Sequence, residues 1–141
     1  MQIGQVGKIC FSRLFEDEDL ADGIKKRVEE SNVKAGALIV IGALKNMVAG
    51  CYKNGEYTYI RVNEPVEIAS CMGNIALDEK GEIIVHAHLV VSDEKGKASG
   101  GHLMKGCRVG PTAELVIIEG KGIDLQRTPD EKTKLKLLRL S

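Results

Sequence analysis

This sequence contains few aromatic residues and has no excess of charge of either sign. Its 141 residues contain no tryptophan, two phenylalanines and three tyrosines. Proteins that bind single-stranded nucleic acids stack bases on aromatic side chains beside basic residues, and no such interleaving occurs here. Lysine plus arginine equals aspartate plus glutamate, at 20 each, so the formal net charge is zero. A neutral chain has no overall field that would attract DNA or an anionic membrane, so direct nucleic-acid binding is not expected.

Long hydrophobic runs and paired cysteines are also missing. The longest apolar stretch, 35–44, is interrupted by two glycines and is too short to span a bilayer. The N-terminal residues do not read as a signal peptide. The four cysteines, at positions 10, 51, 71 and 107, form no Cys-x-x-Cys pair, which argues against a zinc ribbon or a thioredoxin-type site. We therefore expect no membrane association, a cytoplasmic location and reduced thiols.

The composition fits one globular domain over residues 1–141. The chain is 43% hydrophobic and 28% charged, and a chain of this length can bury a core without disulfides. Leu20, Ile24 and Val28 recur at four-residue spacing behind an acidic run, which predicts one helix over 17–32. The other periodic segments are strand-like and cover 6–14, 36–44, 47–52, 57–62, 65–77, 82–92, 112–119 and 135–140.

These segments predict an α+β fold class, with one main helix covering a curved, mostly-β sheet or barrel of seven to nine strands. The Asn54-Gly55 pair predicts a tight hairpin turn. The Gly73-Asn74 pair interrupts the strand at 65–77 and predicts a bulge there. Residues 127–132 form a polar stretch that we expect to be a loop before the last strand.

All three histidines lie within seventeen positions. His86 and His88 are two residues apart in a predicted strand, so both side chains point to the same face. If the polar turn at 93–97 closes a hairpin, His102 returns roughly opposite His88, at about 5 Å between Cβ atoms. Neutral imidazole is a common zinc ligand, and three imidazoles leave a fourth tetrahedral position open. The sequence therefore predicts a metal site formed by His86, His88 and His102.

The fourth ligand of that site stays open among three candidates. A water molecule ranks first, because it would leave a position for a ligand or for hydrolytic chemistry. Cys71 and Cys107 are the alternatives, and a thiolate would favour a structural metal instead. Glu67 is either a solvent-facing carboxylate, a group that accepts a histidine N–H, or a proton shuttle for a metal-bound water. Arg13 lies beside an acidic run, and its side chain can pair with Glu16 or Asp17.

The sequence resembles the plants-and-prokaryotes-conserved (PPC) domain family over nearly its whole length. The segments that carry the resemblance are Arg13-Leu14, Ala35-Gly36, 41–44, 65–75, 85–88 and 100–103. The resemblance implies an antiparallel sheet, a homotrimer, and a metal site at the three matching histidines, with zinc as the first choice. It also implies that an arginine recurs at the position of Arg13, which makes Arg13 a candidate for contact with an anion or a substrate. Plant members carry DNA-binding AT-hook segments outside the domain, and this chain contains no Arg-Gly-Arg-Pro core.

Three functions follow from these observations, in order of preference. The first is an oligomeric zinc-binding domain whose open metal position takes a small-molecule ligand or supports hydrolysis. The second is a non-catalytic module for self-association or partner binding, in which any metal is structural. The third is a DNA-binding regulator, which the zero net charge and the absence of a recognition motif disfavour.

Overall fold

The computed structural model describes residues 1–139, which form ten strands and one helix. In chain order these are β1 (Gln5–Phe15), α1 (Leu20–Ser31), β2 (Gly36–Leu44), β3 (Met47–Lys53), β4 (Glu56–Val62), β5 (Val66–Asp78), β6 (Ile83–Ser92), β7 (Ala98–Leu103), β8 (Val109–Lys121), β9 (Gln126–Pro129) and β10 (Lys136–Arg139). The α+β fold class and the single main helix are therefore confirmed. Position 140, the last residue of the final predicted strand, lies outside the described residues.

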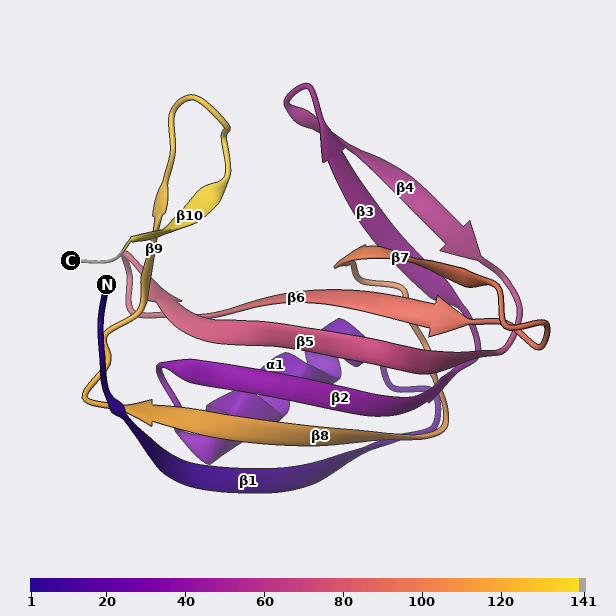
Figure 1. Ribbon diagram of the computed structural model, residues 1–141, viewed down its shortest axis with the longest axis horizontal. Helices are drawn as coiled ribbons and strands as arrows, with labels where there is room; N and C mark the ends of the chain where they lie inside the picture. The colour runs from indigo at the N-terminus through magenta and orange to yellow at the C-terminus, as the bar shows by residue number, and fades with distance from the viewer. Residues whose placement is uncertain (140–141) are drawn as a thin grey trace.

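The strands form one open sheet in the order β1-β8-β2-β5-β6-β7-β3-β4, with β9 and β10 attached at the end of β5. Every pairing along this order is antiparallel, and only β5 and β9 run parallel, over two residue pairs. Figure 1 shows the hairpins β3–β4 and β9–β10 rising on the same side of the sheet. No described helix is long and apolar enough to cross a membrane.

Three predictions about the strands were wrong. The structure has ten strands, where seven to nine were expected, and β9 overlaps the polar stretch 127–132 that was predicted to be a loop. This strand is four residues long and has no hydrophobic alternation, so nothing in its pattern distinguishes it from a turn. The predicted bulge at Gly73-Asn74 is also absent, because both residues pair regularly with Ala87 and His86. The register of β5 shifts instead between Ile68 and Ser70.

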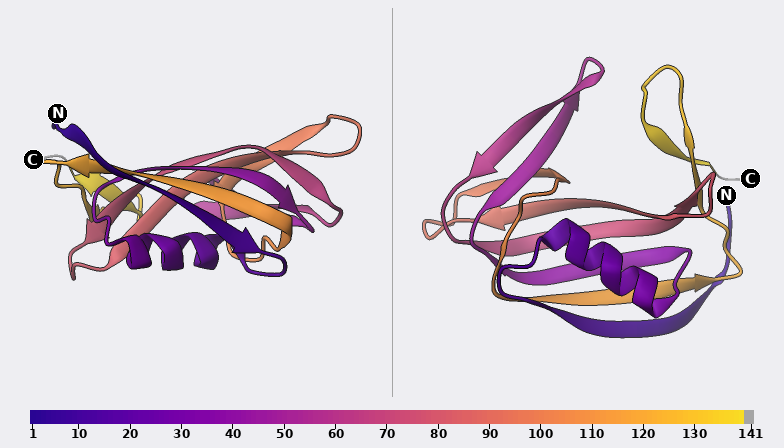
Figure 2. Two further views of the ribbon diagram at one scale, coloured as in Figure 1. Left: turned by 90° about the horizontal axis from the view of Figure 1, so that it is seen from below. Right: turned by 180° about the vertical axis from the view of Figure 1, so that it is seen from behind.

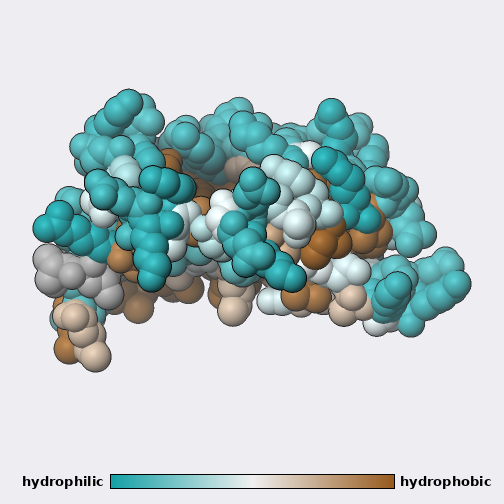
Figure 3. Space-filling model, turned by 90° about the horizontal axis from the view of Figure 1, so that it is seen from above, coloured by the Kyte–Doolittle hydropathy of each residue, from teal (hydrophilic) through white to brown (hydrophobic). Residues whose placement is uncertain are grey.

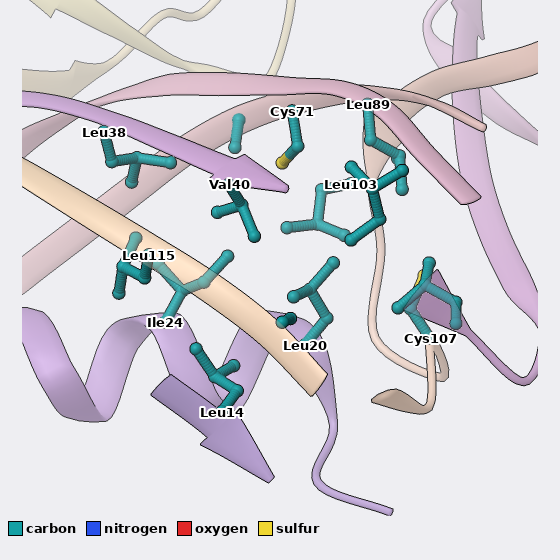
Figure 4. Close-up of a cluster of buried hydrophobic side chains, with 14 of the residues drawn as sticks. Leu14, Leu20, Ile24, Leu38, Val40, Cys71, Leu89, Leu103, Cys107 and Leu115 are labelled. Atoms are coloured by element: carbon teal, nitrogen blue, oxygen red, sulfur yellow. The ribbon is translucent and has the colours of Figure 1, made fainter. Parts of the chain in front are cut away.

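Helix α1 packs on one face of the sheet and builds the core there (Figure 2). Asp19 caps its first turn by accepting the N–H of Asp22, and Asn32 ends it in the left-handed conformation. Leu20, Ile24 and Val28 are fully buried, as their spacing predicted. They belong to one hydrophobic core with sheet residues that include Leu14 and Leu115 (Figure 4). This burial fixes which face of each strand points inward.

Within residues 1–139 no helix covers the opposite face of the sheet, which carries exposed apolar side chains. One row of directly paired residues crosses six strands, and its members are Phe11, Val116, Ile39, Met72, His88 and His102. Phe11 is 80% exposed and Met72 is 60% exposed. In Figure 3 hydrophobic side chains gather along the lower margin of the molecule. We call this helix-free side of the sheet the open face, and the histidines lie on it.

Candidate metal centre

Strand pairing brings the three histidines together on the open face. His86 and His88 come from β6, and His102 comes from β7, where it pairs directly with His88. The turn between these strands is held by Asp93, whose carboxylate accepts the backbone N–H groups of Lys95 and Lys97. The hairpin that the sequence predicted is therefore present, with the register needed to place His102 opposite His88.

The distances between the imidazoles suit a small tetrahedral ion. The Nε2 atoms of His86 and His88 are 3.2 Å apart, and one nitrogen from each of the three rings lies within 4.8 Å of the others. Two nitrogens bound to zinc at about 2.0 Å, at the tetrahedral angle, would be separated by roughly 3.3 Å. The ring centroids are 5.0–5.5 Å apart. The donor set and its spacing therefore fit zinc.

Glycines around His102 allow the strands to approach closely. A Cβ at Gly100 would collide with the Leu89 carbonyl, and one at Gly101 would lie 2.6 Å from the Gly50 carbonyl oxygen. Gly50, opposite His102 on β3, leaves room for the Tyr57 ring. Small residues are needed here because any side chain would push apart the strands that carry the histidines.

Burial keeps two of the rings in the neutral form that binds metals. Burial and then the positive charge of Arg127 lower the pKa of His86 to about 4, and the other two histidines add to this effect. The pKa of His102 is also lowered, first by burial and then by His88 and Arg127. The Tyr57 ring covers His102, with 5.3 Å between centroids. The Nδ1 atom of His102 is buried without a hydrogen-bond partner.

Arg127 of β9 is part of the centre, although the sequence predicts a loop at this position. Its Nη2 atom lies 2.8 Å from Nδ1 of His86 and donates to Oδ1 of Asn74 at 2.9 Å. Its Nη1 atom donates to the carbonyl oxygen of Lys136. Arg127 is only 6% exposed. The nearest signal in the sequence was an arginine within a polar stretch, which carries no information about a contact 41 residues away.

Arg13 and Glu67 lie away from the histidines. Glu67 pairs with Ser92, four residues beyond His88 on β6, which is roughly 13 Å along the strand. Glu67 lines a cavity of about 510 Å³ that also includes Pro111. Arg13 donates to the Pro111 carbonyl at 3.5 Å and to Thr112 at 3.1 Å, and forms no ion pair with the neighbouring acidic residues. The structure therefore separates these two candidates from the metal centre.

The two candidate thiol ligands lie on the helix-covered side. Cys71 pairs with Leu89 and Val40 in the core, and it does not share a face with exposed Glu67, because the register shift lies between them. Burial raises the pKa of Cys71 to about 12. Cys107 is buried, and its thiol donates to the Val48 carbonyl. Neither belongs to the cluster of metal-binding side chains among the described residues.

Known proteins resemble this chain in sequence and in fold. The sequence model of the Plants and Prokaryotes Conserved (PCC) domain matches residues 1–121. A crystal structure of a plant- and prokaryote-conserved protein from Pyrococcus horikoshii is 29% identical, with a TM-score of 0.88 and coverage of 100% of this chain and 98% of that one. A metal-containing protein from Archaeoglobus fulgidus is 30% identical, with a TM-score of 0.87 and coverage of 99% and 100%.

A curated relative is much longer than this chain. The bifunctional protein GlmU from a Synechococcus strain is 30% identical over 127 residues. The match covers 89% of this chain and 19% of that protein. The similarity therefore concerns one part of GlmU.

Proposed function

The chain belongs to the Plants and Prokaryotes Conserved domain family, and we propose that it is an oligomeric metal-binding domain whose three histidines hold a zinc ion. The observation that carries this proposal is the convergence of His86, His88 and His102, with 3.2 Å between two Nε2 atoms. The Archaeoglobus relative, which is described as metal-containing, supports it. A cytoplasmic location is part of the proposal, since all four cysteines are unpaired.

The residues around the centre would have different roles in holding such an ion. The three imidazoles would bind it through nitrogen, and the packing of Tyr57 would fix the His102 ring. Bound zinc would supply a Lewis acid with one open position, able to take a small ligand or to lower the pKa of a water molecule. Cys71 and Cys107 are buried in the core and lie outside the cluster of metal-binding side chains among the described residues, which favours a ligand site over a purely structural one.

Metal analysis of purified protein tests the proposal directly. The protein is prepared without a histidine tag, and the zinc content per chain is measured by mass spectrometry in the wild type and in His88→Ala. We expect about one zinc per chain in the wild type and almost none in the variant, because two imidazoles bind zinc much more weakly than three. Glu67→Gln is the matched control and should keep its zinc. A wild-type protein that contains no metal, and takes up none on dialysis against zinc, would refute the proposal.

A second function, self-association, is favoured by the apolar open face. Phe11, Ile41 and Met72 are each more than half exposed on that face, and exposed apolar patches of this kind mark association surfaces. We propose that copies of the chain cover it, as a homotrimer. Light scattering should give the mass of three chains, and Phe11→Glu should lower it. Leu137→Glu, on exposed β10, is the control. A single-chain mass for the wild type would contradict the assembly.

A further inference from the structure

We infer that the metal centre selects a small oxyanion as its ligand, and that Arg127 positions this ligand. The inference rests on the proposed metal function and names the chemical class that the open position takes. It is carried by two observations on Arg127. Within residues 1–139 its side chain contacts the Lys136 carbonyl, Asn74 and His86, none of which is acidic, and its Nε atom is buried without an acceptor. Both concern a side chain that is buried beside the histidines.

The charges around the centre are all positive or zero once a divalent ion is bound. The cluster of metal-binding side chains contains three histidines and no carboxylate among residues 1–139. Arg127 adds a positive charge in contact with His86. Asp78 pairs with Arg127 along the backbone, but its carboxylate binds Lys136 at 3.0 Å and the backbone N–H groups of two turn residues. A buried cation without an anionic partner is costly, so an anionic ligand is strongly favoured.

The hydrogen bonds of Arg127 lead to the same conclusion. A guanidinium group only donates, so Nδ1 of His86 accepts from Nη2, and the proton of the neutral ring is on Nε2. Metal bound at Nε2 requires that proton on Nδ1 instead, and Nη2 then loses this acceptor. The Nε atom of Arg127 is already buried without a partner. Two N–H donors of one planar group thus lack acceptors, and two oxygens of a carboxylate or phosphate match such a pair.

Side chains from two hairpins contact the histidines from different sides. The β3–β4 and β9–β10 hairpins stand on the same side of the sheet (Figure 1). They are joined by a hydrogen bond of 2.7 Å from the Tyr52 hydroxyl to the carbonyl oxygen of Thr133. Tyr57 packs on His102 from one side, and Arg127 contacts His86 from the other.

Calorimetric titration of zinc-loaded protein with acetate and with acetamide tests the charge preference. The two molecules have nearly the same shape, and only acetate is charged. We expect acetate to bind at least about tenfold more tightly, since the site lacks a negative charge of its own. Inorganic phosphate is titrated separately and shows whether the site prefers a carboxylate or a phosphate. Equal binding of acetate and acetamide, or no binding of acetate and phosphate, would overturn the inference.

Substitution of Arg127 tests its role in positioning the anion. Arg127→Gln should weaken acetate binding at least about tenfold when each protein is loaded with one zinc per chain, and Arg127→Lys should have an intermediate effect because it keeps the charge but loses the planar fork. Arg61→Gln is the matched control, since Arg61 lies over Tyr59 on exposed β4 and should change the affinity less than about twofold. If Arg127→Gln binds acetate as tightly as the wild type does, Arg127 does not position the anion. If Arg127→Gln does not fold, the contrast between acetate and acetamide still tests the anion preference, and Arg127→Lys still tests the role of Arg127.

The failures of the two proposals can be told apart. A protein that binds one zinc per chain but does not discriminate acetate from acetamide keeps the proposed metal function and loses the anion preference. A protein that binds no zinc loses both.

Discussion

The depressed pKa of His86 predicts that the metal-free protein loses stability on mild acidification. The ordinary value of 6.5 falls to about 4 in the folded chain, mainly through burial. Between these values the unfolded chain binds more protons than the folded chain, so the free energy of unfolding decreases as the pH falls. The full difference corresponds to about 2 kcal/mol between pH 7 and pH 5. Because the ring is partly exposed to solvent, we expect about 1 kcal/mol to be observed.

Urea denaturation at pH 7 and pH 5, in the presence of a chelator and at constant protein concentration, measures this loss. His86→Gln removes the titrating ring, so the variant should lose about 1 kcal/mol less than the wild type between the two pH values. The lowered pKa of His102 acts in the same direction in both proteins and cancels in the comparison. An NMR titration gives a direct check, since the His86 ring should remain neutral at pH 5. An equal loss in both proteins, or a His86 titration near pH 6.5, would refute the reasoning.

Three further predictions concern the elements that support the centre. Ile24→Ala, in the fully buried face of α1, should cost about 2–5 kcal/mol in the free energy of unfolding, measured with urea. Asp19→Ala removes the helix cap and the acceptor of the Gly106 N–H, so we expect a loss of about 1–2 kcal/mol in the same assay. Asp78→Asn breaks the ion pair with Lys136. The substitution should then accelerate backbone amide hydrogen exchange more in β9 and β10 than in β6.

The part of the centre that could be predicted depends on short-range rules. Side chains two apart on a strand share a face whatever the rest of the fold is, so His86 and His88 were placed correctly from their spacing alone. The position of His102 followed from one polar turn, because the register of a hairpin is set by its loop. The helix could also be predicted, since the four-residue spacing of its apolar residues and its acidic start are both local signals.

The part that could not be predicted depends on contacts between distant segments. Arg127 reaches His86 only because β9 runs parallel to the end of β5, where Asp78 and Arg127 pair. No local pattern encodes such a pairing. The Gly73-Asn74 pair predicts a bulge because glycine interrupts a strand pattern. In the structure Gly73 stays regular and is needed for close packing, since a Cβ there would collide with the His86 carbonyl.

The placement of the histidines links ligand binding to assembly. Helix α1 covers one face of the sheet, so the apolar side chains on the open face have no cover within the described chain. Met72 and His88 are directly paired on that face, and directly paired side chains stand about 5 Å apart. Any protein surface that covers Met72 therefore also approaches His88, the most exposed of the three histidines. Assembly through the open face would narrow access to the metal and remove water from it, which strengthens the attraction between the centre and an anion.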